Sequence, residues 1–318
     1  ENFLLHRTRA LRLLELMKLN QKSWGLAVFA SANAIQKYSM KELVDLGISW
    51  IWIGLESPHS SYSKLNGTDT RQLTRKLREH GIRVQGSTIM GLEHHTPENI
   101  EQEIQHAITH NTDFHQFMLY TPVPGTPLYR QIAAEGRLDD SVDFADIHGQ
   151  YKFNFRHAAI SSDDSKRFLD WAFRRDFECN GPSLYRMCET MLKGWLRYKN
   201  TPDLRVRKRF KREVAKLSTA YNAALWAMER EFREINPSVS TEIRKLRKQI
   251  EHEFGMSSRA IAWTLGPFLQ WATRREQKRL ARGWTYEPPS ILERSNWPNP
   301  SKSRQMGAGV LEEPALAT

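Results

Sequence analysis

Four short apolar runs recur along the first half of the chain, and segments with helical periodicity separate them. The runs are rich in β-branched and aromatic residues, as buried strands are, and lie about 25 to 33 residues apart. This alternation predicts βα units and a parallel sheet. The expected strands cover residues 24–30, 48–54, 82–90 and 114–120, and the expected helices cover residues 6–19, 40–46, 70–80 and 96–110.

A barrel and an open doubly wound sheet both satisfy this pattern. No Gly-x-Gly-x-x-Gly motif follows any of the four runs, so a dinucleotide-binding fold receives no support. In either architecture the working groups sit at the carboxyl ends of the parallel strands. The residues to inspect are therefore Ser31 and Asn33, residues 54–57, residues 91–96 and residues 121–127.

The second half of the chain is helical in pattern from Asp163 onward, which predicts a bundle of four or five helices. The further helical patterns cover residues 184–198, 206–235, 241–254 and 259–282, with a break at Asn236-Pro237 and a bend at Gly266-Pro267. The expected parts are a βα portion at 1–137, a connector or lid at 138–160, a basic helical domain at 161–286 and a disordered tail at 287–318.

The excess of positive charge lies wholly in the second half. Residues 1–150 hold 15 Lys and Arg against 17 Asp and Glu, whereas residues 151–318 hold 32 against 19. The basic clusters lie at 205–212, 244–248 and 274–282. We interpret them first as solvated helix surfaces, second as a binding site for an anionic substrate or membrane surface, and last as a binding site for nucleic acid. The mean hydropathy of −0.61, without a long uncharged apolar run, excludes an ordinary membrane-spanning helix.

The two cysteines, Cys179 and Cys188, are too few for a disulfide scaffold or for an iron–sulfur cluster, which takes three or four thiolates. We expect both to be buried structural thiols. No secretory signal opens the sequence, so the expected localisation is cytoplasmic, with association to a membrane surface left open. Glu1 begins in the middle of a pattern, which favours a fragment of a longer protein.

Polar residues follow the apolar runs at the expected strand ends. Glu56 ends an otherwise apolar run, where an unpaired buried charge would be costly, so it is either a ligand contact or a cap or ion pair. Residues 93–95, Glu-His-His, match no usual zinc spacing and indicate a polar rim of a site. Residues 122–127, Pro-Val-Pro-Gly-Thr-Pro, are too stiff to extend a strand and favour a structural role.

Three strand-end motifs together resemble the radical S-adenosylmethionine (radical SAM) enzymes, most closely the branch that carries a cobalamin-binding domain. They are residues 54–57 (Gly-Leu-Glu-Ser), 89–98 (Ile-Met-Gly-Leu-Glu-His-His-Thr-Pro-Glu) and 120–129 (Tyr-Thr-Pro-Val-Pro-Gly-Thr-Pro-Leu-Tyr). The resemblance covers about residues 1–140, and residues 175–177 and 181–184 extend it more loosely.

The resemblance implies a partial (βα)6 TIM-like radical SAM barrel followed by an α-helical C-terminal domain. Residues 1–3 would match the end of the barrel's second strand. A Cys-x-x-x-Cys-x-x-Cys loop holding a [4Fe–4S] cluster would lie upstream of Glu1, since this chain contains no such loop and no metal ligands. Cobalamin, an external electron donor and a small-molecule or lipid-like substrate are implied as partners of the complete enzyme, and an anionic substrate is left open.

In that family, polar groups at the strand ends hold S-adenosylmethionine. The residues carried over are Glu56 (to the ribose hydroxyls), Ser57, Ser87, Gly91, Ser31 and Asn33. The implied activity is radical chemistry, with methyl transfer as its expected outcome. Two alternatives stay open: a basic helical module that binds nucleic acid or an anionic membrane on an inactive barrel scaffold, and a different βα-barrel enzyme that uses no cluster.

Overall fold

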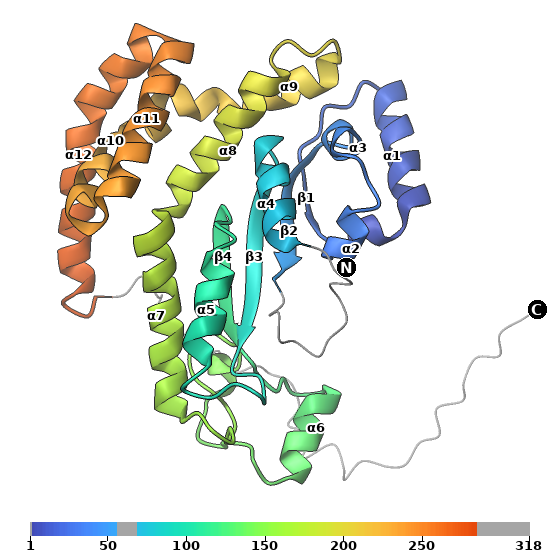
Figure 1. Cartoon of the computed structure of the whole chain (residues 1–318), viewed down its shortest axis with the longest axis vertical. Coiled ribbons are helices and arrows are strands. Elements are labelled where there is room, and N and C mark those ends of the chain that lie inside the picture. The colour runs from blue at the N-terminus through green and yellow to red at the C-terminus, as the bar shows by residue number, and fades with distance from the viewer. Residues whose placement is uncertain (1, 56–68, 285–318) are drawn as a thin grey trace, which may run out of the picture. The chain divides into compact units, whose positions relative to one another are not determined.

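The computed structural model describes residues 2–55 and 69–284. Its sheet has four parallel strands in the order β1-β2-β3-β4 (Figure 1). Along the chain, at least one helix connects each strand to the next. The strands are β1 Leu26–Phe29, β2 Ile48–Gly54, β3 Arg83–Met90 and β4 Phe114–Leu119. The four expected strands and their parallel arrangement are confirmed, and closure into a barrel stays a prediction.

The helices of the first half lie between the strands or beside them. They are α1 Arg7–Leu19, α2 Ala32–Ile35, α3 Met40–Asp45, α4 Thr70–Glu79, α5 Ile100–Ile108 and α6 Pro127–Ala134. Those of the second half are α7 Ser162–Asn180, α8 Ser183–Tyr198, α9 Leu204–Glu213, α10 Asn222–Ile235, α11 Pro237–Phe254 and α12 Met256–Leu280. The chain divides into compact units Glu1–Arg274 and Arg275–Thr318. The domain boundaries expected from the sequence stay a prediction.

Local signals explain where several helices begin. Ser39 and Glu42 form a reciprocal capping box at the start of α3. The expected helix at 96–110 begins only at Ile100, because residues 97–99 form a turn, although the carbonyl of Thr96 already accepts from the amide of Ile100 at 3.0 Å. The two-turn helix α6 was not expected: Thr126 caps it at the end of the proline-rich segment.

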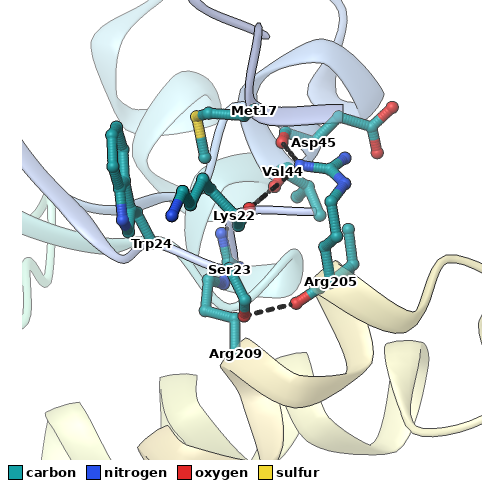
Figure 2. A pocket seen from close by; sticks show the side chains of 10 residues that line it. Met17, Lys22, Ser23, Trp24, Val44, Asp45, Arg205 and Arg209 are labelled. Carbon is teal, nitrogen blue, oxygen red and sulfur yellow. Dashed lines mark hydrogen bonds between the residues drawn. The ribbon is translucent and has the colours of Figure 1, made fainter. Parts of the chain in front are cut away.

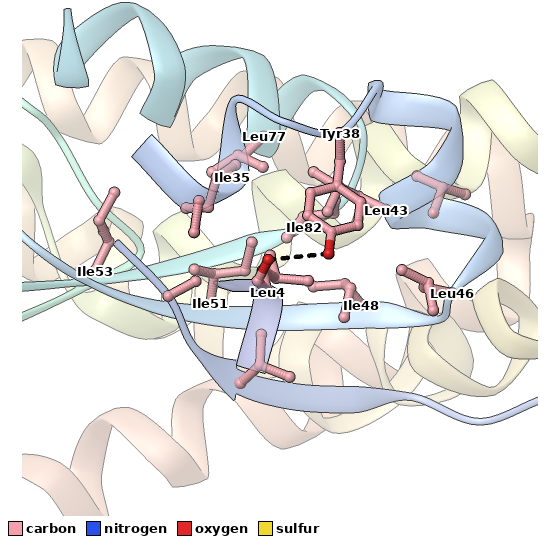
Figure 3. Close-up of a cluster of buried hydrophobic side chains, with 14 of the residues drawn as sticks. Leu4, Ile35, Tyr38, Leu43, Leu46, Ile48, Ile51, Ile53, Leu77 and Ile82 are labelled. Carbon is pink, nitrogen blue, oxygen red and sulfur yellow. Dashed lines mark hydrogen bonds between the residues drawn. The ribbon is translucent and has the colours of Figure 1, made fainter. Parts of the chain in front are cut away.

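One face of the sheet is buried under helices. Ile51 and Ile53 of β2 point into a cluster filled by α1, α2, α3 and α4 (Figure 3). Within it the hydroxyl of Tyr38 donates to the carbonyl of Leu4 at 2.9 Å, so even the polar atom of this ring is satisfied. A second cluster packs Phe117 of β4 against α5 and α7. The first helix of the C-terminal half therefore belongs to the same core as the sheet.

The long helical pattern expected at 206–235 is interrupted. A 3₁₀ turn at Val214–Lys216 and a π turn at Leu217–Tyr221 separate α9 from α10, and Thr219 has non-helical angles (φ −129°, ψ −108°). The expected break at Asn236-Pro237 is confirmed, since the Asn236 side chain caps α11. Among the described residues, none of the helices combines the length and apolar character needed to cross a membrane.

Candidate functional site

The face of the sheet opposite the two hydrophobic clusters, here called the open face, carries partly exposed side chains. The strand register places four of them in one row, because Phe29 pairs with Trp52, Trp52 with Gln85 and Gln85 with Phe114. The rings of Phe29 and Trp52 stack with their centroids 4.6 Å apart, and Phe29 is 50% exposed. This pair forms an aromatic platform with an amide group beside it.

The next row, nearer the carboxyl edge, is small and polar. Gly54 pairs with Ser87, and Ser87 pairs with Gln116. The Nε2 of Gln85 donates to the Oε1 of Gln116 at 3.3 Å, which joins the polar row to the platform. Ser87, one of the predicted site residues, therefore lies on the open face, partly exposed and between a glycine and an amide.

The residues at the start of the described chain meet the carboxyl end of β1. Asn2 forms a parallel bridge with Phe29 and donates from Nδ2 to the Oγ of Ser31 at 2.8 Å. Its Oδ1 is buried and has no hydrogen-bond partner within residues 2–55 and 69–284. Ser31 also caps α2 by accepting from the amide of Ala34, and the predicted Asn33 lies partly buried in that helix. The sequence analysis did not single out Asn2 as a ligand.

Gly91 occupies the loop that follows β3. Its φ of +74° is in the left-handed region, and a Cβ built on it would lie 2.2 Å from the ring of Phe153. The space beside this glycine is therefore filled by the chain itself. The neighbouring His95 is 2% exposed, so it is buried rather than placed at a polar rim; its Nδ1 accepts from the amides of Gly91 and Leu92 at 2.9 and 3.2 Å.

Those two bonds fix the tautomer of His95, with the proton on Nε2. Burial, followed by the nearby His94, lowers the pKa of His95 to about 4. The imidazole therefore stays neutral and serves as an acceptor that closes the loop. Of the remaining predicted residues, Glu56 and Ser57 lie outside the described residues, and all the predicted cofactor contacts stay predictions.

We expect the protein to lose stability in mild acid, because its buried histidines take up protons only when the chain unfolds. Burial lowers the pKa of His115 to about 3; its ring stacks on Phe117 at 4.0 Å and its Nε2 lies 3.0 Å from the hydroxyl of Thr88. The unfolded chain binds this proton near pH 6.5, so stability present above that pH is lost as pH falls. Between about pH 7 and about pH 5 His115 alone is expected to lower the free energy of unfolding by about 2 kcal/mol.

Urea unfolding at both pH values measures this loss, and the variant His115→Phe should show a smaller pH dependence because no proton is taken up at that site. His110, whose pKa is also lowered to about 4 by burial, contributes in the same direction in both proteins. An equal pH dependence of parent and variant would contradict the assignment.

The two cysteines are free and lie in different helices. Cys188 is fully buried, and burial raises the pKa of its thiol, while Cys179 is partly buried in α7. The described part of the chain contains no group of three or more His, Cys, Asp or Glu residues placed to hold a metal ion.

The basic cluster at 205–212 binds the chain's own backbone. Arg209 is 1% exposed and donates to the carbonyls of Val44 and Ile48 at 3.2 and 3.1 Å. Arg205 is also buried; it reaches the carbonyls of Lys22 and Asp45 at the edge of a cavity of about 10 Å³, roughly the room that one water molecule needs (Figure 2).

Val44 and Asp45 end α3, so these guanidinium groups complement the negative end of a helix dipole. Arg207, Lys208 and Lys211 are the members of the cluster that stay exposed without a described role in packing. Arg212 donates to the carbonyl of Ser23, so three of the six basic residues bind the chain's own backbone. Recognition of nucleic acid or an anionic surface by the rest stays a prediction.

The family-like segments 175–177 and 181–184 form the corner between α7 and α8. Arg186 donates to both carboxylate oxygens of Asp176, at 3.1 and 2.7 Å, and to the hydroxyl of Ser183 at 3.2 Å. Arg186 and Asp176 are both buried, and a bidentate pair fixes geometry strongly there. The two segments therefore position helices rather than line the open face.

Comparison with known proteins adds two distant relatives. Over 145 residues the chain is 27% identical to the bacteriochlorophyllide d C-8(2)-methyltransferase of Chlorobaculum tepidum. The matched segment covers 43% of this chain and 31% of that enzyme. Over 167 residues it is 29% identical to the hopanoid C-2 methylase of Rhodopseudomonas palustris, covering 47% and 32%. No protein-family model matches. The chain thus spans about a third of the curated relatives it matches, and both of these are named for methyl transfer.

Proposed function

We propose that this chain is a portion of a radical SAM methyltransferase, containing part of its barrel and a helical region, and that the open face and carboxyl edge of its sheet bind S-adenosylmethionine. The observation that carries the proposal is the convergence, at one sheet edge, of an aromatic platform, the partly exposed Ser87 and the buried acceptor oxygen of Asn2. The strand-end motifs and the two methyltransferase relatives support the same assignment.

The residues present fit the cofactor's chemistry. A planar adenine stacks favourably on aromatic rings, which the Phe29–Trp52 pair offers. The cofactor's amino and ribose hydroxyl groups are donors, and the Oδ1 of Asn2 is a buried acceptor whose desolvation is otherwise uncompensated among the described residues. When bound, the cofactor would supply the transferable methyl group and the radical. The chain's part is to hold it against the sheet and away from water.

The iron–sulfur cluster does not fit this chain. A cluster needs three or four accessible thiolates, whereas Cys188 is fully buried and Cys179 lies on another helix. The proposal therefore places the cluster ligands, and any cobalamin, in segments outside residues 1–318. An external electron donor and a small or lipid-like substrate belong to the proposal on the same basis.

The test is S-adenosylmethionine binding by the protein made from its complete reading frame, reconstituted anaerobically with iron and sulfide. Ser87→Ala is expected to weaken binding about fivefold to tenfold, the loss that one hydrogen bond typically brings. Ser238→Ala, at an exposed serine on α11, is the matched control and should leave the affinity unchanged. Glu56→Ala tests the ribose assignment in the same assay.

Unchanged affinity in Ser87→Ala would remove this serine from the site. Failure of the reconstituted parent to bind S-adenosylmethionine would overturn the proposed function and favour a βα enzyme without a cluster.

A further inference from the structure

Helix α12 turns its small residues toward the protein. Ser258, Ala262 and Gly266, spaced four apart, are its buried positions. The side chain of Asn222 donates to the carbonyl and hydroxyl of Ser258 at 3.2 and 3.1 Å. A Cβ on Gly266 would lie 2.7 Å from the ring of Trp226. The close approach of α10 thus leaves room only for small side chains at these three positions.

Leu269 packs against the cluster on this inner face, but four other large apolar residues of α12 point outward. Met256, Trp263, Phe268 and Trp271 are 74, 58, 57 and 55% exposed, and the rings of Phe268 and Trp271 lie 5.9 Å apart. We call these four the α12 aromatic stripe. An ordinary surface helix buries its large apolar residues and exposes its polar ones. Because more than half of each of these four side chains is exposed, the stripe indicates an interaction surface.

The charge of the helix indicates which partner the stripe would meet. Along its sequence α12 carries Arg259, Arg274, Arg275, Lys278 and Arg279 against a single acid, Glu276. Arg274 pairs with Glu231 of α10 at 2.8 Å and Arg279 pairs with Glu276 at 3.2 Å, so basic residues still outnumber acidic ones on and around the helix. Tryptophan and phenylalanine favour the boundary between lipid headgroups and acyl chains, and basic residues are attracted to anionic headgroups. A second copy of the chain would instead bring two positively charged helices together, which like-charge repulsion disfavours.

We propose that the α12 aromatic stripe docks the protein on the surface of an anionic phospholipid bilayer. The aromatic side chains insert at the headgroup boundary, and the basic residues of the helix add electrostatic attraction. The inference does not rest on the proposed methyl transfer, since docking needs neither S-adenosylmethionine nor a cluster.

The experiment is sedimentation of the whole chain with vesicles of phosphatidylcholine alone or of phosphatidylcholine and phosphatidylglycerol in equal amounts. The parent should partition onto the anionic vesicles, and added salt should weaken that binding. The double variant Trp263→Ser/Trp271→Ser is expected to lower the partition coefficient about tenfold or more, because two interfacial tryptophans are lost. Phe144→Ser is the matched control, since Phe144 is 76% exposed and lies outside α12.

Circular dichroism of each variant confirms that these exposed substitutions leave the fold intact. Absence of parent binding to anionic vesicles, or equal binding by parent and double variant, would overturn the proposal. So would a dimer, seen by light scattering, that the double variant dissolves, because the stripe would then meet a second copy. Tighter binding of single-stranded DNA than of vesicles, lost in the double variant, would assign the stripe to base stacking instead.

Discussion

Replacing Asp113 by alanine is expected to lower the free energy of unfolding by about 3–5 kcal/mol. Asp113 has no exposed surface and precedes β4. It accepts from the hydroxyl of Thr190 at 2.6 Å and from the amide of Val84 at 2.8 Å, and the Nε of the buried Arg78 lies 3.4 Å away. The substitution leaves a buried cation with one fewer partner and two donors unsatisfied, which costs more than the pair itself contributes.

Urea-induced unfolding at neutral pH measures the change. Asp170→Ala is the matched control, because Asp170 pairs with Lys166 at 3.1 Å on the exposed face of α7 and should change stability by less than about 1 kcal/mol. Arg78 keeps its 2.9 Å contact with Glu189 in the variant. A loss below about 1 kcal/mol for Asp113→Ala would mean that this second carboxylate is sufficient.

The buried network around Asp113 also connects the two halves of the chain. Arg78 belongs to α4, Asp113 precedes β4, and Thr190 belongs to α8, so the network joins both halves of the chain. Helix α8 is thereby fixed to the amino end of the sheet, whereas the proposed cofactor edge is the carboxyl end. The helical half can therefore stabilise the sheet without obstructing the open face.

The strands were predictable because each is a short apolar run between turn residues. The sequence did not indicate that one face of the sheet is buried and the other is open. Trp50 and Trp52 alternate with Ile51 and Ile53, and both sets are apolar, so the sequence indicates a strand buried on both faces. Only the placement of the helices decides that the isoleucines are buried and that Trp52 belongs to the open face. Short α2 and α6 lacked enough turns to show a period.

The buried polar contacts lay further beyond sequence reasoning. Arg205 and Arg209 have the composition of a solvated basic run, and their burial depends on carbonyl groups at the end of α3, about 160 residues away. The burial of the Asn2 Oδ1 without a hydrogen-bond partner among the described residues likewise depends on how the start of the chain pairs with β1. A helical period also continues through Thr219, where the backbone departs from the helix. Periodicity reports spacing along the chain and carries no information about such long-range contacts.

Gly91→Ala is expected to lower the free energy of unfolding by about 3 kcal/mol or more. The left-handed backbone costs a residue with a Cβ about 1–2 kcal/mol, and overpacking adds about 1–3 kcal/mol. Phe153 cannot easily withdraw, because it is 1% exposed and its ring contacts those of Phe155 and His157 at centroid distances of 5.1 and 5.4 Å. The control is Gly136→Ala, where φ is +64° and no atom lies within 4 Å of the new Cβ.

A double-mutant cycle separates the two causes. In a Phe153→Ala background the ring is gone, so adding Gly91→Ala should cost only about what Gly136→Ala costs. The same variants distinguish a role of Gly91 in cofactor binding from a role in packing. If space for a cofactor required Gly91, its alanine variant would lose S-adenosylmethionine affinity while keeping its stability. The filled space beside Gly91 predicts the reverse order: Gly91→Ala lowers stability first, and in the Phe153→Ala background adding Gly91→Ala changes the affinity no further.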